Sequence, residues 1–283
     1  MSSASTLYIV ATPIGNLGDI TLRAVETLRT VDRVVAEDTR RTRGLLAHLG
    51  IEKKPLTSLE AHAGQREIDR VVDWLVDGQT VALVTDAGVP AVSDPGSALV
   101  QAAARAHVRV VPIPGPSALT AAVAASGIVT GGFRFCGFLP RGGTARSDAL
   151  TRILSTPEPV VLFEAPQRLA ATLAELSELC PERALVVARE MTKLHEEFVR
   201  GTVAELASAA REWLGEITLV LGADAEAGAG VKVSDGELDA RIDAELQGGA
   251  TAKTVAQRVA AWSGRSRREV YERVLAAKER AGD

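Results

Sequence analysis

Aromatic residues, cysteines and long apolar runs are scarce in this chain, and each scarcity narrows the kind of protein it encodes. Only 4% of the 283 residues are aromatic although 46% are hydrophobic, which favours parallel strands packed between helices over an aromatic-rich β-sandwich. The two cysteines, Cys136 and Cys180, form no C-x-x-C pair, so we expect neither a disulfide framework nor a zinc site. No apolar run approaches the roughly 20 residues of a membrane span, and residues 1–10 lack the basic flank of a secretory signal. We therefore expect a cytoplasmic protein without a bound metal.

Positive charge is also in short supply. The formal net charge is −4, which argues against a general nucleic-acid coat. The charges are unevenly spread, because residues 224–247 hold seven acidic against two basic side chains and residues 253–280 hold eight basic against three acidic ones. The sequence therefore predicts a basic arm at the end of an acidic protein.

The first part of the chain alternates between short apolar runs and segments with helical spacing. We expect strands at 6–11, 32–37, 80–86 and 108–114, and helices at 21–31, 39–50, 66–78 and 97–106. The run 80–86 has few polar interruptions, as is typical of a strand covered on both faces. The alternation predicts an N-terminal α/β domain, residues 1–117, with a mostly parallel sheet and right-handed crossovers.

The second part of the chain has a different order of elements. We expect strands at 133–140, 159–165, 184–190, 196–203 and 217–223, with helices near 144–154, 166–179 and 203–213. The strands at 184 and 196 follow each other without a helix, so they should pair antiparallel. This predicts a second α/β domain, residues 118–224, with a mixed sheet, and places the boundary near residues 112–127.

A small helical module is expected after a linker rich in glycine and alanine at 223–233. Two pairs, Ser234 with Glu237 and Ser266 with Glu269, have capping-box spacing at helix starts. Three helical patterns then predict a basic domain at 234–283. Two interpretations stay open: a relative of the helix-turn-helix, or a packing domain that only happens to be basic.

Four loops rich in glycine and proline each follow an expected strand, at 11–19, 85–96, 112–118 and 163–168. In an open α/β sheet, ligands bind beyond the carboxyl ends of the strands, so the four loops together predict one cleft. The first loop lacks the G-x-G-x-x-G of a dinucleotide site and the Lys-Ser/Thr that closes a P-loop.

These loops carry carboxylates and almost no cations. Arg168 is the single basic residue near them, whereas Asp19, Asp86 and Asp94 would repel a phosphate. Such a lining suits a ligand with a positive centre, hydroxyls and a flat adenine-like face, and S-adenosylmethionine has all three. For Asp19 and Asp94 the alternative is a local role as helix caps.

Several stretches resemble the tetrapyrrole methylase superfamily, and in particular the bacterial family of ribosomal RNA small-subunit methyltransferase I. The motifs "AEDTR", "TDAGVPAVSDPG" and "TKLHEE" carry much of the resemblance. The full set spans 7–28, 34–46, 82–96, 111–119, 135–141, 162–169, 188–202 and 215–223. The resemblance implies a two-domain α/β fold that binds S-adenosylmethionine in the cleft. It further implies 2′-O-methylation of a cytidine in 16S rRNA on the small ribosomal subunit, by a homodimer.

The resemblance also implies which residues contact the donor. They are Pro13, Gly15, Leu17, Gly18, Asp86, Ala87, Gly88, Val89, Ser93, Asp94, Ser117, Ala118, Phe163, Glu164, Ala165, Pro166 and Ala188. The chain departs from the family at Gln167, where a histidine is usual, so we expect no catalytic imidazole there. Residues 125–133 also differ, and residues 58–67 follow the family only in part, which weakens any role for Glu60 or His62.

Candidate bases for the acceptor hydroxyl are acidic or basic residues near the cleft: Glu37, Asp38, Glu164, Glu190, Lys193, His195 and Glu196. We favour Glu190, Lys193 and His195, because they cluster on a turn between two expected strands; the alternative is an ion-paired surface. For RNA contact we favour Arg40, Arg41, Arg43, Arg265, Arg267 and Arg268 over a merely solvated helix face.

Two rival functions remain at this point. A methyltransferase acting on a small tetrapyrrole would not need the basic C-terminal module. A non-catalytic RNA-binding or ribosome-binding protein would not need all four cleft loops.

Overall fold

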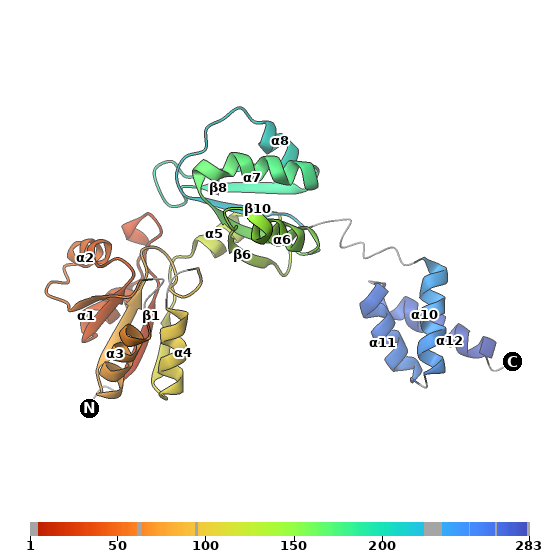
Figure 1. The fold of residues 1–283 in the computed structure, drawn as a ribbon, viewed down its shortest axis with the longest axis horizontal. Helices are drawn as coiled ribbons and strands as arrows, with labels where there is room; N and C mark the ends of the chain where they lie inside the picture. Colours follow the sequence, from red (N-terminus) through yellow and green to blue (C-terminus); the bar gives the residue numbers. More distant parts are fainter. Residues whose placement is uncertain are drawn as a thin grey trace.

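A computed structural model describes residues 5–60, 64–93, 96–223, 234–248, 250–263 and 265–281. Figure 1 shows two α/β units side by side, the first red to yellow and the second green to cyan, with the blue C-terminal helices set apart. The predicted α/β fold class with a small helical module is confirmed. None of the helices in the described part of the chain is long and apolar enough to cross a membrane.

The first unit is a five-stranded parallel sheet in the order β3-β2-β4-β1-β5. Its strands are β1 (Thr6–Val10), β2 (Arg33–Ala36), β3 (Leu56–Ser58), β4 (Thr80–Val84) and β5 (Arg109–Ile113). Its helices are α1 (Leu22–Thr30), α2 (Thr39–His48), α3 (Gln65–Val76) and α4 (Ser97–Arg105), after the short 3-10 helix η1 (Leu17–Asp19). Buried side chains fill both faces, with α3 and α4 over one and α1 and α2 over the other, which explains why all of β4 is buried.

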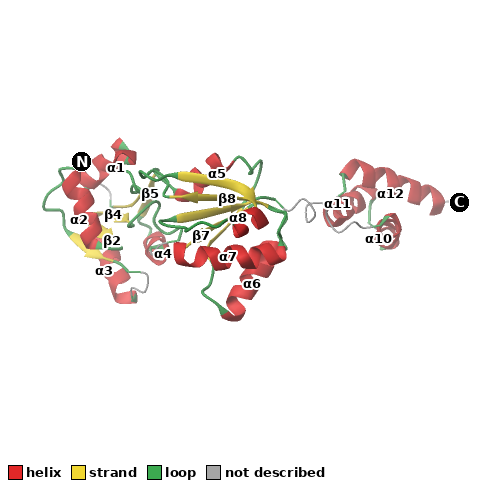
Figure 2. Cartoon of the chain, turned by 90° about the horizontal axis from the view of Figure 1, so that it is seen from above, coloured by secondary structure: helices red, strands yellow, loops and turns green. Residues whose placement is uncertain are grey.

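The second unit is a mixed five-stranded sheet in the order β6-β7-β10-β8-β9. Its strands are β6 (Arg134–Phe138), β7 (Val160–Glu164), β8 (Ala184–Arg189), β9 (Glu197–Thr202) and β10 (Ile217–Leu221). Its helices are α5 (Ala118–Ser126), α6 (Gly143–Leu154), α7 (Pro166–Leu179) and α8 (Val203–Ser208). The predicted antiparallel pairing of β8 with β9 is confirmed. Figure 2 shows these strands running between α5 on one side and α6, α7 and α8 on the other.

Three further helices, α10 (Asp235–Gln247), α11 (Ala252–Ser263) and α12 (Arg267–Ala281), share a core of their own. Leu238, Ile242, Val255, Val259 and Val270 contribute to it, as the helical spacing predicts. The Ser234 capping box is complete. At α12, the Ser266 hydroxyl accepts from the backbone N–H of Glu269 at 3.2 Å.

Three elements of the structure differ from the prediction: two were not predicted, and one helix is shorter than expected. The strand β3 was not predicted, since three residues at a sheet edge give too short a pattern. The alanine-rich α5 was also missed, because its helix is apolar all round and shows no amphipathic stripe. The helix expected at 203–213 ends at Ser208, and Trp213 instead packs into the core of the second unit.

Candidate active site

A cavity of about 360 Å³ lies between the two α/β units, where loops of the first sheet meet the second. Predicted donor residues that line it are Ala87, Gly88, Val89, Ser93, Ser117, Ala118, Phe163, Glu164, Ala165 and Pro166. Predicted donor residues that do not line it are Pro13, Gly15, Leu17, Gly18, Asp86 and Ala188. Asp94 lies outside the described residues.

Sequence reasoning missed several residues that line this cavity. They are Ile14, Val92, Leu119, Phe138, Met191, Gly215, Glu216, Ile217 and Thr218. Phe138 ends β6, so the rule that ligands lie beyond strand ends could have identified it. Glu216 precedes β10 and carries no such signal.

The first two cleft loops are bonded to each other. The N–H of Thr12 donates to the Gly88 carbonyl at 2.9 Å, and the N–H of Gly88 donates to the Thr12 carbonyl at 3.0 Å. Gly88 has φ of +83°, a conformation that side chains rarely adopt. The Thr12 hydroxyl also donates to the Thr85 carbonyl at 3.0 Å. These bonds hold the loop at 85–88, which lines the cavity at Gly88, against Thr12 of the first loop.

Gly15 provides a close approach between the two units. A Cβ at this position would lie 2.5 Å from Lys193 Cγ and 2.8 Å from the Thr192 hydroxyl. Any larger residue would therefore push the first loop off the turn at 190–196. Asp19 does not cap α1, because the Thr21 side chain accepts from Ala24 N–H in that role; the capping interpretation of Asp19 is wrong.

Asp86 organises the loops from outside the cavity lining. One carboxylate oxygen accepts from the backbone N–H of Asp38 at 3.1 Å, and the other lies 3.4 Å from Arg41 Nη1. Burial is the main cause that raises the pKa of Asp86. Nearby, Glu37 accepts from the Thr85 hydroxyl at 2.7 Å. The "AED" and "TDAG" segments are thereby joined at the ends of β2 and β4.

The turn at 190–196 brings two of the three favoured catalytic candidates together. Lys193 Nζ lies 2.9 Å from Glu190 Oε1 and 3.2 Å from Glu216 Oε2, and Glu190 Oε1 also accepts from the Glu216 backbone N–H at 2.8 Å. The side chain of His195 is exposed, and within the described residues no hydrogen bond or ion pair links it to this cluster. The structure therefore joins Glu190 to Lys193 and adds Glu216.

Hydrogen bonding fixes the charges in this cluster. The bond from Lys193 is the main cause that lowers the pKa of Glu190. Burial opposes the charge on Lys193, yet its bonds to Glu190 and Glu216 raise the pKa of Lys193 above its ordinary value. Lys193 is thus an ammonium that holds two carboxylates, and a neutral amine base is disfavoured.

The backbone of the same turn is strained. Glu190 and Thr192 have φ of +51° and +68°, and positive φ is an outlier for a β-branched residue such as threonine. The Thr192 hydroxyl is buried, with no hydrogen-bond partner among the described residues. Strain of this kind clusters at functional sites.

Other candidate bases are already occupied. The buried carboxylate of Glu164 accepts from the Thr172 hydroxyl at 2.7 Å and from Ala165 N–H at 2.8 Å. Asp38 caps α2, and Glu196 accepts from Thr192 N–H at 2.6 Å. Each of these carboxylates therefore has a structural task.

An aromatic cluster forms one wall of the cavity. Phe163 lies 5.0 Å from Phe135 and 5.6 Å from Phe138 between ring centroids. Phe138 is 58% exposed although it lies in the cavity wall. An exposed ring held this firmly offers a surface for a flat ligand.

Glu197 anchors the loop that carries Gly215 and Glu216. Its carboxylate lies 2.7 Å from Arg211 Nη2 and 2.9 Å from Arg189 Nε, and Arg189 also donates to the Leu214 carbonyl at 3.3 Å. The bonds from Arg211 and then Arg189 lower the pKa of Glu197 to about 2.

Glu197→Gln is expected to flatten the dependence of stability on acid pH. The wild-type carboxylate has a folded pKa of about 2 against an ordinary value near 4.5, so its contribution is present above the ordinary value and is lost as the pH falls towards 2. Urea unfolding from neutral pH down to about pH 3 measures this. Glu212→Gln, on the same loop and exposed, is the matched control; equal pH profiles for Glu197→Gln and wild type would contradict the prediction.

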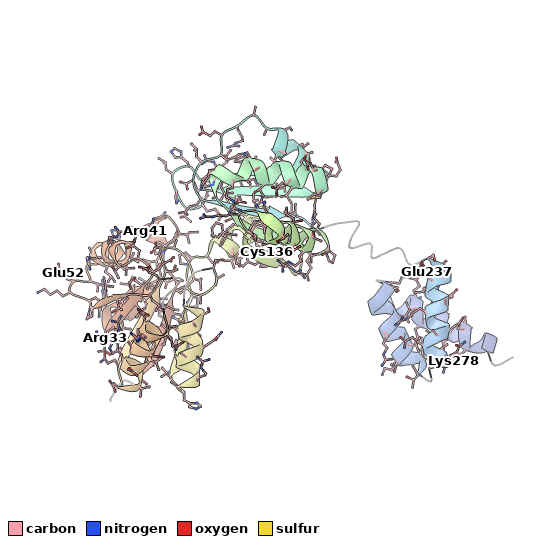
Figure 3. All side chains as sticks on the ribbon, viewed as in Figure 1. Arg33, Arg41, Glu52, Cys136, Glu237 and Lys278 are labelled. Atoms are coloured by element: carbon pink, nitrogen blue, oxygen red, sulfur yellow. The ribbon has the colours of Figure 1, made fainter. Side chains whose placement is uncertain are left out.

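The arginines predicted to contact RNA have acidic partners in several cases. On α2, the helix that carries the Arg41 labelled in Figure 3, Arg40 pairs with Asp38 at 3.1 Å, and Arg43 is exposed. In the C-terminal helices, Arg265 pairs with Asp235 at 2.7 Å and Arg268 with a glutamate one turn away. The side chain of Arg267 lies outside the described residues.

The C-terminal module is less basic than its second half suggests. Residues 234–281 hold nine lysines and arginines against eight aspartates and glutamates. Arg273 on α12 pairs with Asp235 and Asp239 on α10 at 2.8 and 3.1 Å. The acidic helix therefore neutralises much of the basic segment.

The amino-acid sequence matches one protein family and several of its members. The family model for Tetrapyrrole (Corrin/Porphyrin) Methylases matches residues 6–207. A protein of Xylella fastidiosa named ribosomal RNA small subunit methyltransferase I is 44% identical over 276 residues, 96% of this chain and 99% of that protein. The protein of the same name from Thermotoga maritima is 49% identical over 217 residues, 76% of this chain and 97% of that protein.

Solved structures share the fold. A diphthine synthase superposes with a TM-score of 0.60 at 20% identity, covering 77% of this chain and 90% of its own. A uroporphyrin-III C-methyltransferase from Thermus thermophilus, complexed with S-adenyl homocysteine, gives 0.54 at 22% identity, covering 77% and 97%. The chain therefore belongs to the tetrapyrrole methylases and, within them, to the family of ribosomal RNA small subunit methyltransferase I.

Proposed function

We propose that this protein uses S-adenosylmethionine to methylate the ribose 2′-hydroxyl of a cytidine in 16S rRNA, acting on the small ribosomal subunit. The observation that supports the donor is the chemistry of the cavity. Among the described residues, no lysine or arginine lines it, whereas the acidic residues Glu164 and Glu216, backbone groups and an aromatic wall do. A cationic donor with an adenine ring suits such a lining. The rRNA acceptor is supported by the names of the relatives.

S-adenosylmethionine, when bound, supplies an electrophilic methyl group. The protein's share is to hold the acceptor oxygen in line and to keep water out, and positioning can contribute roughly 7–11 kcal/mol at best. We propose that the loops at 85–93 and 163–166 hold the donor. The Lys193 ammonium then orients the acceptor, and a carboxylate of Glu190 or Glu216 receives its proton, a contribution of about 10²–10⁴-fold.

The direct test uses purified protein, tritiated methyl donor and small ribosomal subunits from cells that lack the enzyme. Label should appear in 16S rRNA and, after digestion, in 2′-O-methylcytidine. Donor binding without any label in the RNA would overturn the proposed function. Label on a base would overturn the ribose assignment alone, and label in an added tetrapyrrole but not in RNA would favour the small-molecule rival.

Asp86→Ala is expected to weaken donor binding about tenfold, because the Asp38 N–H and Arg41 lose their shared acceptor and the loop at 86–89 loses its anchor. Calorimetric titration with S-adenosylmethionine measures this. Asp73→Ala, an exposed aspartate on α3 that does not line the cavity, serves as the control. Unchanged donor affinity in Asp86→Ala would contradict the prediction.

We propose three working units, residues 1–117, 118–224 and 234–283, with the donor held by the first two. Deleting residues 235–283 is expected to weaken RNA binding and to leave donor affinity unchanged, because the last three helices pack around a core of their own. The Thermotoga maritima relative supports the second half of this, since 217 aligned residues already span 97% of that protein. Filter binding across a salt titration measures the first half. Equal RNA affinity after the deletion would refute it.

We also propose a homodimer. Leu22 and Leu194 expose 90% and 92% of their surface, apolar area that a second copy could cover. Light scattering after gel filtration should give twice the mass of one chain, and a single-chain mass at micromolar concentration would refute the dimer.

A further inference from the structure

A second cavity, of about 400 Å³, opens on the second α/β unit and is lined by arginines. Arg141, Arg146 and Arg168 contribute three guanidinium groups, and among the described lining residues Glu175 alone contributes a carboxylate. In the active-site cavity, by contrast, none of the described lining residues is a lysine or arginine. The two cavities therefore suit ligands of opposite charge.

The two cavities are neighbours along two stretches of chain. Phe138 lines the active site, and Arg141, three residues later, lines the second cavity; three residues span at most about 11 Å. Pro166 and Arg168 repeat this relation after β7. Because β6 and β7 are parallel neighbours, both stretches follow the carboxyl ends of their strands, at the same end of the sheet. The linings of the two cavities therefore come within two or three residues of each other at this end of the sheet.

Two of the arginines are held rigidly. Arg146 is 8% exposed, and it donates to Glu175 at 2.9 Å, to the Pro140 carbonyl at 3.1 Å and to the Thr172 hydroxyl at 2.9 Å. Arg168 donates through Nη2 to the Leu139 carbonyl at 2.7 Å. Within the described residues, Arg168 Nη1 has no recorded acceptor. A guanidinium has five N–H groups, so both side chains keep donors for a ligand.

Arg141 differs from the other two. It is exposed, and in the described part of the chain no ion pair or hydrogen bond of its side chain is recorded. A purely structural role, in which Arg146 and Arg168 hold the carbonyls of Leu139 and Pro140 by hydrogen bonds, would explain these two side chains. It would account neither for Arg141 nor for the open space at Gly142 and Gly143, where an added Cβ would meet nothing within 4 Å.

We propose that this cavity binds a backbone phosphate of the RNA strand whose neighbouring ribose enters the active site. The proposal rests on the proposed function. Arg141 contacts the phosphate directly, and Arg146 and Arg168 present fixed donors around it, since arginine forks match phosphate oxygens. A phosphate contact of this kind sets the register of the strand and carries no sequence information of its own.

The test compares Arg141→Glu and Arg141→Ala with Arg134→Glu, in the full-length protein. Arg134 is an exposed arginine at the opposite end of β6, which makes it a matched control. Binding of a 16S rRNA transcript is measured by filter retention without methyl donor, over a range of salt. Donor affinity is measured separately by calorimetry, and circular dichroism checks the fold.

Arg141→Glu should weaken RNA binding about tenfold and should lower the slope of log Kd against log salt by about 0.7 to 0.9, the share of one phosphate. Arg134→Glu should stay within about twofold of wild type. Donor affinity should not change in any variant. RNA affinity and salt slope equal to wild type in both Arg141 variants would overturn the proposal, as would a parallel loss of donor affinity.

Inorganic phosphate distinguishes the two sources of this chemistry. If millimolar phosphate binds the wild type but not Arg141→Ala, while RNA binding is the same in both, the cavity is a free-anion site and the RNA assignment falls. The proposed function fails separately: absence of methyl label in 16S rRNA, together with the loss of RNA binding in Arg141→Glu, would refute the methylation and leave the phosphate site standing.

Discussion

Replacing Lys193 by methionine is expected to lower the rate of methyl transfer about 100-fold or more, with donor affinity changed by only a few-fold. Methionine keeps most of the side-chain length that packs against Gly15. It removes the ammonium that lies 2.9 Å from Glu190 and 3.2 Å from Glu216. Two carboxylates would then face each other without a counter-charge, and the acceptor would lose its orientation.

The pH dependence of this variant provides a second readout. Because the hydrogen bond from Lys193 is the main cause of the lowered pKa of Glu190, that pKa should rise in Lys193→Met. The acid limb of the rate profile should therefore move to higher pH. A merely structural lysine would not move it.

Two further variants complete the comparison. Lys53→Met removes an exposed lysine of the first unit and should leave the rate unchanged. His195→Ala should cost little, because no contact is recorded between its exposed side chain and the cluster within the described residues. If His195→Ala lost as much activity as Lys193→Met, the imidazole would be the base, and the assignment of that role to a carboxylate held by Lys193 would be wrong.

Glu164→Ala is expected to reduce the free energy of unfolding by about 1–3 kcal/mol for each buried donor that it leaves without an acceptor. The Glu164 side chain is 0% exposed and lies 3.3 Å from Arg168 Nε. Its loss also leaves the Thr172 hydroxyl and the Ala165 N–H without their acceptor. Because Arg168 would lose its partner, the loop after β6 should loosen as well.

Guanidinium unfolding of purified variants measures this effect. Glu178→Ala, an exposed glutamate on α7, is the matched control and should change stability by less than about 0.5 kcal/mol. Glu164→Gln keeps acceptor capacity but loses the charge, so it should fall between the two. A loss below about 1 kcal/mol in Glu164→Ala would show that the pair contributes little.

The parts of the fold that the sequence predicts are those with a local signal. The unbroken apolar run of β4 predicts burial on both faces, and the lack of a helix between β8 and β9 predicts their antiparallel pairing; both are confirmed. The capping box at Ser234 is likewise local and confirmed. The family resemblance is confirmed over residues 6–207.

The parts that sequence could not supply depend on contacts between distant segments. Gly15 looks like a ligand glycine, yet its nearest neighbours are Thr192 and Lys193. Glu216 lies beside Lys193 because β8 and β10 pair in the second sheet, and no motif near Glu216 in the sequence predicts this contact. The excess of basic residues in the last helices can be counted in the sequence. Their ion pairs with the acidic α10 depend on how the helices pack, which the sequence does not show.

Ile14 bears on how ligands reach the cleft. This residue belongs to the first loop, but it is only 7% exposed and packs in the same core as Val161, Val186 and Val220 of the second unit. Swinging the two sheets apart as a hinge would return Ile14 to water, at a cost of about 1.5–3 kcal/mol. That cost keeps a wide-open form below about a tenth of the population. Ligands should therefore enter the cleft through small movements of the loops at its rim, while the two sheets move together as one body.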